Sequence, residues 1–145
     1  MSKLYYTWQD FESDCRCLAK ELEKDKVEYQ QIVAITRGGL FVAGLLSQFL
    51  KAVPIETVSI HSYYGSERKR MEIMKEGTSD KPTLICDDVV DTGYTAEAVK
   101  KMYPNSKVVV LHYKSKNNPV IKPDYFAQDT DKWIVYPWEV NKNDK

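Results

Sequence analysis

The stretch Thr83-Leu84-Ile85-Cys86-Asp87-Asp88-Val89-Val90-Asp91-Thr92-Gly93-Tyr94-Thr95 decides the fold. Its first four residues form an apolar, partly β-branched run, which predicts a buried parallel strand. Two acids end that strand, and a Thr-Gly-x-Thr turn opens a helix expected from Ala96 to Tyr103. A strand followed by a turn and a helix is the start of a right-handed β-α-β crossover. The stretch therefore predicts an α/β fold with an open, mostly parallel sheet flanked by helices.

The turn in this stretch carries groups that suit a phosphorylated sugar. Backbone amides at a helix N-terminus hold phosphate, and Thr92 and Thr95 add hydroxyl donors. Gly93 lets the backbone come close to a ligand. Asp87 and Asp88 suit vicinal ribose hydroxyls or a hydrated Mg²⁺. The alternative is that the two acids only cap turns and pair with surface lysines. Because Asp91, Thr92, Gly93 and Thr95 follow the two acids in one continuous motif, we favour a sugar-phosphate site over this alternative.

The same alternation of elements continues on both sides of this stretch. A capping box, Thr7–Asp10, precedes apolar residues at helical spacing and predicts a helix from about Trp8 to Lys24. Apolar runs predict further strands and one helix packed in the interior. The strands are expected at Ile32–Ile35, Val53–Ser62 and Lys107–His112, and the interior helix at Leu40–Lys51.

Two segments lack this patterning. The polar segment from Tyr63 to Pro82 predicts a mobile loop or hairpin. The residues after His112 contain three prolines and no clear period, so we expect irregular structure there. Residues 141–145 are polar and should form a frayed tail.

Composition excludes several classes of function. The chain has 145 residues and a mass of 16.8 kDa, which predicts one domain. Lys+Arg and Asp+Glu both number 21, so nothing marks a broad surface for nucleic acid or anionic membrane. The apolar stretch Gly39–Leu50 is too short for a membrane span. The absence of an apolar signal region and the three unpaired cysteines (Cys15, Cys17 and Cys86) predict a cytoplasmic protein.

The segment Asp87–Thr95 resembles the phosphoribosyl-pyrophosphate signature of the type I phosphoribosyltransferases. Ile35–Leu40 is similar to the pyrophosphate loop of their xanthine-guanine branch, and Asp131–Glu139 is similar to the base-binding segment of that branch. The resemblance extends from about Thr7 to Glu139. It implies a single phosphoribosyltransferase domain over residues 1–140, with a core over about 1–113 and a hood over the base site at about 114–140.

The resemblance also implies an activity. Members of this branch are purine salvage enzymes that transfer 5-phosphoribose from its pyrophosphate donor to a 6-oxopurine and release pyrophosphate. Mg²⁺ accompanies the pyrophosphate in the family. The expected partners are the donor, a purine base and a nucleoside monophosphate, with no nucleic acid, and the expected assembly is a homodimer or homotetramer. The preference among guanine, xanthine and hypoxanthine stays open.

Individual roles follow from the same resemblance. Asp87 and Asp88 match the ribose-binding acids, Asp88 is the candidate metal ligand, and Asp91 matches an acid near the purine N7; these three are the catalytic candidates. Lys114 is expected at the purine O6 and Trp133 on the face of the ring. The donor-binding set comprises Arg37, Gly38, Lys69, Asp87, Asp88, Val89, Val90, Asp91, Thr92, Gly93, Tyr94 and Thr95. The base-binding set comprises Asp91, Lys114, Trp133 and Ile134. The loop that contains Arg37 and Gly38 is expected to hold a cis peptide bond.

Three positions depart from the pattern of the branch. Tyr94 stands where Gly is frequent, so its ring should point outward. Glu139 replaces an expected Asp, which leaves recognition at the purine 2-position open. The basic contact to pyrophosphate is Arg68, Lys69 or Arg70, and we choose Lys69.

Other interpretations remain for these residues. A lone Trp in an apolar segment usually packs in the core, a lone Lys after a strand is usually solvated, and a Gly pair usually marks a plain turn. The main functional alternative is a regulator of the same fold that binds the donor or a nucleotide without turning it over. Such a protein usually has an added effector surface or DNA-binding domain, and we see no candidate for either in this short, neutral chain.

Overall fold

The structure is a computed structural model that describes residues 2–64, 69–73 and 77–140, without the side chains of residues 61–76. The elements are β1 (Lys3–Tyr5), α1 (Trp8–Lys24), β2 (Gln31–Thr36), α2 (Gly38–Phe49), β3 (Ile55–Tyr64), β4 (Lys69–Ile73), β5 (Thr83–Val90), α3 (Tyr94–Met102), β6 (Ser106–Tyr113), the 3₁₀ turn η1 (Ser115–Asn117), β7 (Tyr125–Asp129) and β8 (Trp133–Val135).

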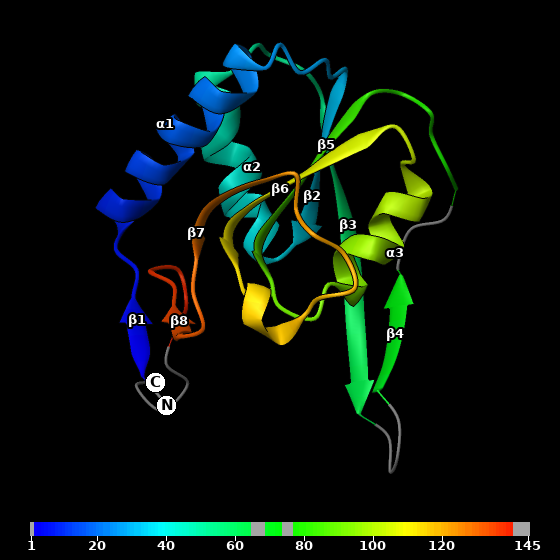
Figure 1. Cartoon of the computed structure of the whole chain (residues 1–145). Coiled ribbons are helices and arrows are strands. Elements are labelled where there is room, and N and C mark those ends of the chain that lie inside the picture. The colour runs from blue at the N-terminus through cyan, green and yellow to red at the C-terminus, as the bar shows by residue number, and fades with distance from the viewer. Residues whose placement is uncertain (1, 65–68, 74–76, 141–145) are drawn as a thin grey trace.

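The main sheet has the strand order β4-β3-β2-β5-β6-β7. Every neighbouring pair is parallel except β3 with β4, which run antiparallel. Helices α1 and α2 lie on one face of this sheet and α3 lies on the other (Figure 1). The fold class expected from the sequence is therefore confirmed.

Strand residues alternate between two hydrophobic cores. In β2, Ile32 and Ala34 pack beneath α1 and α2, whereas Val33 and Ile35 pack beneath α3. Strands β5, β6 and β7 show the same alternation, as expected for a sheet that is covered on both faces. Among the side chains described in β3, only Val58 and Ile60 reach a core, the one beneath α3. Among the described residues, no helix has the length and apolar character that crossing a membrane requires.

Helix α1 has the predicted bounds, and its capping box is present. The Asp10 amide donates to the Thr7 hydroxyl and the Thr7 amide donates to the Asp10 carboxylate, both at 3.0 Å. The antiparallel pairing of β3 with β4 confirms a hairpin within the polar segment. Cys15 is buried and Cys17 is exposed, so the two thiols point to different sides of α1.

The expectation of irregular structure after His112 was wrong. Strand β7 adds to the edge of the main sheet, and β8 pairs in parallel with β1 in a separate two-stranded sheet. Strand β7 is an edge strand whose first four side chains are all half-buried, and β8 has three residues, so neither gives a clear periodic signal. Strand β1 also has only three residues, and the sequence did not predict it.

Several predicted boundaries also differ. Strand β5 continues four residues beyond Cys86, because β6 still pairs with it at Asp87, Val89 and Val90. Its pairing with β2 ends at Cys86. The two acids therefore lie within a strand that has lost one neighbour, rather than after its end. Strand β3 is shifted two residues later than predicted, and α3 begins two residues earlier.

Candidate active site

The acids Asp87 and Asp88 are half-buried in the last part of β5. Their side chains are held by local hydrogen bonds: the Asp88 amide donates to Oδ1 of Asp87, and the Val89 amide donates to Oδ1 of Asp88, both at 2.8 Å. Burial raises the pKa of both carboxyls, and the neighbouring Asp88 charge raises that of Asp87 further. A cation or several hydroxyl donors at this place would stabilise the ionised pair.

The loop between β2 and α2 lies directly against these acids. The peptide bond between Thr36 and Arg37 is cis, as the family resemblance implied. A Cβ added to Gly38 would lie 2.2 Å from Oδ2 of Asp88, and one added to Gly39 would lie 2.3 Å from the Cys86 carbonyl oxygen. The start of α2 can approach β5 this closely only because both residues lack side chains.

A cavity of about 810 Å³ opens at this edge of the sheet. It combines the two acids, the exposed Arg37 and aromatic side chains from α2 and the C-terminal segment. The lining residues are Ile35, Thr36, Arg37, Gly38, Phe41, Ile60, Asp87, Asp88, Thr95, Trp138, Glu139 and Val140. Burial and the Asp88 charge raise the pKa of Glu139. Such a cavity is large enough for a nucleotide-sized ligand.

A smaller cavity of about 250 Å³ lies over the turn that leads into α3. It is lined by Asp87, Asp88, Val89, Val90, Asp91, Thr92, Gly93, Thr95 and Ala96. Gly93 has a φ of +85°, and a Cβ there would lie 3.0 Å from Ile121, so this turn requires glycine. The Tyr94 side chain is exposed, as expected. Asp87, Asp88 and Thr95 line both cavities, so the turn that leads into α3 lies next to the larger cavity.

The chain matches the family model described as the phosphoribosyl transferase domain over residues 1–144. It belongs to the phosphoribosyltransferase family. A xanthine-guanine phosphoribosyltransferase from Chromohalobacter salexigens is 36% identical over 136 residues, which are 92% of this chain and 82% of that protein. The resemblance to this family that we draw from the sequence is thus confirmed.

Solved structures agree with this assignment. A purine phosphoribosyltransferase from Pyrococcus horikoshii is 34% identical, has a TM-score of 0.84 and covers 97% of each chain. A protein from Neisseria gonorrhoeae, whose crystal structure contains bound ppGpp, is 28% identical with a TM-score of 0.79 and covers 99% of this chain and 92% of that one.

The phosphoribosyltransferase chain brings Lys114 and Trp133 together near the end of β5. Only 8% of the Lys114 surface is exposed, and its Nζ lies 5.6 Å from the centre of the half-exposed Trp133 ring. The Lys114 amide donates to the Val90 carbonyl at 3.0 Å, which fixes it to the end of β5. Asp91 is exposed, and its Oδ1 accepts a hydrogen bond from Asn117 at 2.5 Å.

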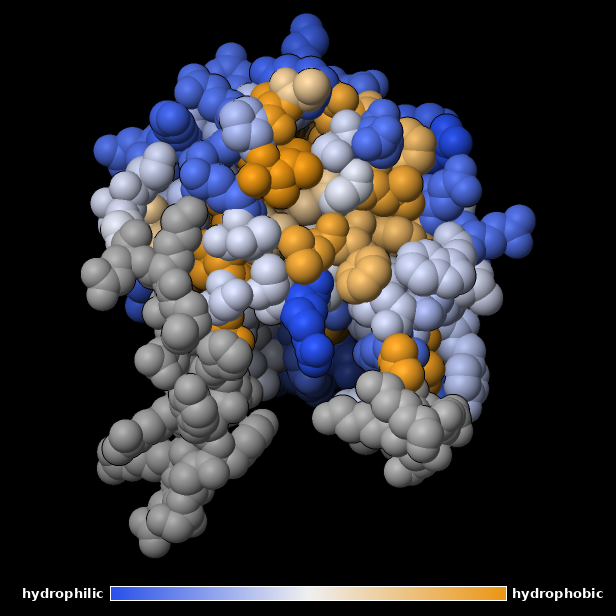
Figure 2. Space-filling view, turned by 180° about the vertical axis from the view of Figure 1, so that it is seen from behind, coloured by the Kyte–Doolittle hydropathy of each residue, from blue (hydrophilic) through white to orange (hydrophobic). Residues whose placement is uncertain are grey.

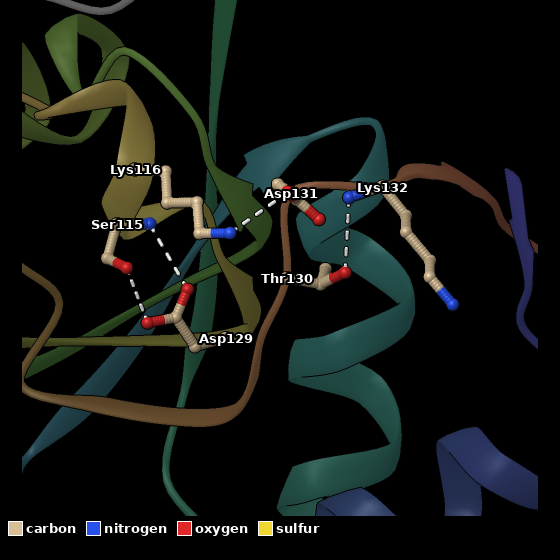
Figure 3. A network of polar contacts seen from close by, with 6 residues as sticks. All are labelled: Ser115, Lys116, Asp129, Thr130, Asp131 and Lys132. Atoms are coloured by element: carbon tan, nitrogen blue, oxygen red, sulfur yellow. Dashed lines mark hydrogen bonds and ion pairs between the residues drawn. The ribbon is translucent and has the colours of Figure 1, made fainter. Parts of the chain in front are cut away.

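A polar network holds the segments on which Lys114 and Trp133 lie. Ser115 donates to the Asp129 carboxylate through its amide at 3.2 Å and its hydroxyl at 2.5 Å (Figure 3). Lys116 forms an ion pair with Asp131 at 3.2 Å. These contacts join η1 to the turn between β7 and β8, so the position of Lys114 is coupled to that of Trp133.

A second network lies beneath the acids and is buried. The Tyr136 hydroxyl donates to the Asp88 carbonyl at 3.2 Å and lies 2.9 Å from Nδ1 of His112. Since the hydroxyl donates to the carbonyl, it accepts from an Nδ1–H group. Among the described residues, Nε2 of His112 has no hydrogen-bond partner, and burial together with Lys114 lowers the pKa of this imidazole to about 4. His112 is therefore neutral at pH 7.

The predicted donor-site residues line the two cavities, apart from Tyr94, which lines neither, and Lys69, whose side chain is outside the described part of the chain. Lys114, Trp133 and Ile134 do not line either cavity. Sequence reasoning missed Phe41 and Trp138, whose rings stack with centroids 4.6 Å apart and 6° between their planes. Nothing in the spacing of these two aromatic residues marks them as partners, because they are far apart in the chain.

Proposed function

We propose that this chain is a purine salvage phosphoribosyltransferase that transfers 5-phosphoribose from phosphoribosyl pyrophosphate to a 6-oxopurine. The observation that carries the proposal is the junction of the two cavities at Asp87, Asp88 and Thr95. The turn that would hold the phosphate, the two acids that would bind the ribose and the loop with Arg37 would then follow the order of the groups in the donor. The relationship to purine phosphoribosyltransferases supports the purine as acceptor.

The donor would lie across both cavities. Its 5′-phosphate would accept hydrogen bonds from the amides of residues 91–95 and from the hydroxyl groups of Thr92 and Thr95. The ribose hydroxyls would donate to Asp87 and Asp88. The pyrophosphate would lie against Arg37 and the amides near Gly38, with Lys69 as the proposed further basic contact.

The reaction breaks the bond between C1′ and the pyrophosphate oxygen, which keeps the electron pair, and forms a bond between C1′ and a purine nitrogen. Positive charge develops on the ribose ring, as in glycoside cleavage. The carboxylates of Asp87 and Asp88 would stabilise that charge, and Arg37 would stabilise the departing pyrophosphate. Asp91 would hold or take the proton at the purine N7.

We also propose that the reaction depends on Mg²⁺, which the family implies. Among the described residues, no group of three His, Cys, Asp or Glu side chains forms a metal cage. This fits Mg²⁺, which is usually bound by one or two carboxylates together with substrate phosphates and water. Asp88, with Asp87 beside it, would hold the ion. When bound, the ion would neutralise charge on the pyrophosphate.

For the base, we propose that Lys114 donates to the purine O6, that Trp133 covers the ring and that the Ile134 backbone reads the base edge. An ammonium group has three donors and no acceptor, so it cannot pair with the amino group at the 6-position of adenine. Discrimination against a base that leaves a buried polar group unpaired reaches a factor of about 10⁴. Adenine should therefore be a poor substrate.

The test is the initial rate of nucleoside monophosphate formation with guanine, xanthine, hypoxanthine and adenine, with Mg²⁺ and with a chelator. We expect activity with at least one 6-oxopurine, dependence on Mg²⁺, and a large loss of 6-oxopurine activity in Lys114→Ala. Lys107→Ala is the matched control, since Lys107 is exposed near the start of β6. A wild-type protein that prefers adenine, or a fully active Lys114→Ala, would contradict the assignment of the base site.

A second candidate function is a regulator that binds a nucleotide without turnover. The Neisseria gonorrhoeae relative with bound ppGpp keeps this candidate open. Binding of the donor or of a nucleotide in calorimetry, with no product from any purine base, would favour the regulator. The three cysteines are free in the structure, and we propose a reducing, cytoplasmic location for the protein.

A further inference from the structure

A further cavity lies at the end of the sheet opposite to the two acids. Its volume is about 220 Å³, and its lining residues differ from those of both cavities in the candidate active site. They come from the end of α1 and from the segments that lead from α1 into β2 and from α2 into β3. Figure 1 shows both helices ending at the top of the sheet, whereas the turn that leads into α3 lies near the bottom. A ligand in this cavity would therefore not occupy the space of the proposed donor.

The walls of this cavity are largely apolar. Leu22 is buried, and Val27 and Leu50 are half-buried. The Tyr29 ring forms a further part of the wall and is only 6% exposed. The volume of about 220 Å³ equals that of about seven water molecules, each of which takes about 30 Å³ in the liquid. The space therefore suits a molecule of the size of leucine and is too small for a nucleotide.

Three exposed charged residues line the same cavity: Glu23, Lys26 and Lys51. None of them forms an ion pair with a described residue. The Lys51 ammonium lies 4.8 Å from the centre of the Tyr29 ring, a cation–π contact that keeps it at the cavity wall. A ligand with a carboxylate and an ammonium group could therefore pair with charges of both signs.

The Tyr29 hydroxyl adds a hydrogen-bond donor. Its oxygen accepts a bond from the Lys51 amide at 3.2 Å, and its proton has no acceptor among the described residues. Burial raises the pKa of this hydroxyl, and the nearby charge of Glu23 acts in the same direction, so the proton is retained at neutral pH. Because Tyr29 lines the cavity, a carboxylate oxygen bound there would satisfy this donor.

Lys26 is the least expected residue of the group. It follows the C-cap of α1 with a φ of +52°. Its amide donates to the Glu23 carbonyl, and the Val27 amide donates to the Leu22 carbonyl, both at 3.0 Å. In this arrangement the left-handed residue is usually glycine, because a Cβ is unfavourable there. Lys24 already supplies a cation in the last turn of the helix. A lysine at position 26 therefore weakens the end of α1, and the cavity beside it gives its side chain a use.

We propose that this cavity binds a free α-amino acid with an apolar side chain. Its carboxylate would accept hydrogen bonds from Lys26, Lys51 and the Tyr29 hydroxyl, and its ammonium group would donate to Glu23. Its side chain would lie against the apolar wall. A free amino acid carries both charges on one carbon atom, whereas a fatty acid or either end of a peptide carries only one of them. Glu23 would repel a plain anion, and the two lysines would repel a plain amine.

The surface around this end of the molecule has a similar distribution of polarity. Seen from behind, hydrophilic residues lie along the upper edge, and apolar side chains gather below them (Figure 2). The ends of α1 and α2 lie at this upper edge. A ligand with a charged head and an apolar body matches such a boundary better than a uniformly polar one does.

The test is isothermal titration calorimetry of the full chain with L-leucine. Three probes each lack one of its groups: isocaproate lacks the ammonium group, isoamylamine lacks the carboxylate, and glycine lacks the side chain. We expect saturable binding of L-leucine and affinities at least about tenfold lower for the three probes. Glu23→Gln should reduce the preference for L-leucine over isocaproate, because it removes the charge that pairs with the ammonium group.

Lys26→Gly separates a binding role from a structural one. Glycine adopts the left-handed conformation without strain, so the thermal midpoint should not fall. The affinity for L-leucine should nevertheless fall by about tenfold or more, since one ammonium group is lost. Lys24→Ala is the matched control, because Lys24 is exposed and does not line the cavity, and it should keep the wild-type affinity.

Three outcomes would overturn the proposal. They are the absence of saturable L-leucine binding, an equal affinity for isocaproate or isoamylamine, and an unchanged affinity for L-leucine in Lys26→Gly. None of these measurements depends on the reaction proposed at the other end of the sheet, so its failure and theirs are distinguishable.

Discussion

Gly38 sets the spacing between the Arg37 loop and the acids. A Cβ there would lie 2.2 Å from Oδ2 and 2.4 Å from Cγ of Asp88, and these side-chain atoms can swing away. We therefore expect Gly38→Ala to fold while displacing the Asp88 carboxylate. Misplacement of a catalytic group by about 1 Å lowers rates by about a hundredfold, and steady-state kinetics should show a loss of kcat/KM of that order.

The neighbouring variant Gly39→Ala separates this effect from a folding defect. Its Cβ would meet the Cys86 carbonyl oxygen at 2.3 Å, a backbone atom in the middle of the sheet. That backbone cannot move aside easily, so Gly39→Ala should lose about 1–3 kcal/mol of unfolding free energy. Equal thermal midpoints for the two variants, or a fully active Gly38→Ala, would contradict this account.

The buried His112 predicts a pH dependence of stability. Its ring makes T-shaped contacts with Tyr6 and Tyr136, and burial together with the charge of Lys114 lowers its pKa from 6.5 to about 4 on folding. A depressed pKa means that the unfolded chain binds the proton more readily. The contribution of neutral His112 is therefore complete above pH 6.5 and is lost as the pH falls towards 4. The loss is roughly 3 kcal/mol over that range.

Urea unfolding at several pH values between about 7 and 4 measures this dependence. His112→Asn is the matched variant, because its amide can still donate to the Tyr136 hydroxyl but does not titrate. The wild type should be more stable than His112→Asn at neutral pH, and the difference should shrink as the pH falls. A constant difference across the range would show that His112 is not the titrating group.

At the scale of elements, Tyr136 connects the segment after β8 to β5. In Tyr136→Phe, Nδ1 of His112 and the carbonyl of Asp88 lose the hydroxyl group that both contact. Leaving buried polar groups unpaired costs about 1–3 kcal/mol, and the loss should appear in denaturant unfolding. We also expect a lower kcat, since Asp88 is anchored through this contact.

Tyr125→Phe is the control for Tyr136→Phe. The Tyr125 hydroxyl donates to Asp25 at 2.6 Å in an exposed contact, and neither residue lines the two cavities. Surface changes of this kind alter stability by about 0.5 kcal/mol or less and should leave kcat unchanged. Similar losses in both variants would mean that the buried network has no special importance.

Elements with a strong period or a strong terminal signal could be predicted from the sequence. Helix α1 has a capping box and a regular apolar stripe, and its bounds were correct. Strands β1 and β8 have three residues each, and they form only because distant parts of the chain pair with each other. Residues 87–90 extend β5 through pairing with β6, which no local pattern reveals.

The candidate site likewise contains residues that a local sequence motif predicts and residues that it does not. The acids and the Thr92–Thr95 turn form one continuous motif, so local sequence could predict that they lie together at one cavity. Lys114 and Trp133 were placed only through the family resemblance, since a single Lys or Trp has no specific local signal. Phe41 and Trp138 meet through tertiary packing of α2 against the C-terminal segment, and neither was predicted.

At the scale of the whole molecule, the two ends of the described chain come together. The pairing of β1 with β8 places Leu4 opposite Ile134, so the first and last strands of the described chain lie side by side (Figure 1). The proposed donor site, by contrast, is built on β2, β5 and the starts of α2 and α3. The N-terminal strand therefore supports the proposed base site without touching the proposed donor site.

A chain that lacks residues 2–5 tests whether β1 supports the proposed base site and not the proposed donor site. Strand β8 pairs only with β1 among the described residues, so the deletion removes the sole strand partner of the segment that carries Trp133 and Ile134. We expect the KM for the purine base to rise by about tenfold or more, because ordering that segment would then cost binding energy. The KM for the donor should stay near the wild-type value.

Lys3→Ala is the control for this deletion, because the Lys3 side chain is exposed and the substitution keeps the backbone that pairs with Trp133. Its two KM values should equal those of the wild type. Steady-state kinetics with each substrate varied in turn separates the base from the donor. A deletion that raises both KM values equally would show that β1 stabilises the whole fold. A deletion that raises neither would show that β8 holds its place without β1, against the idea that the chain ends jointly support the base site.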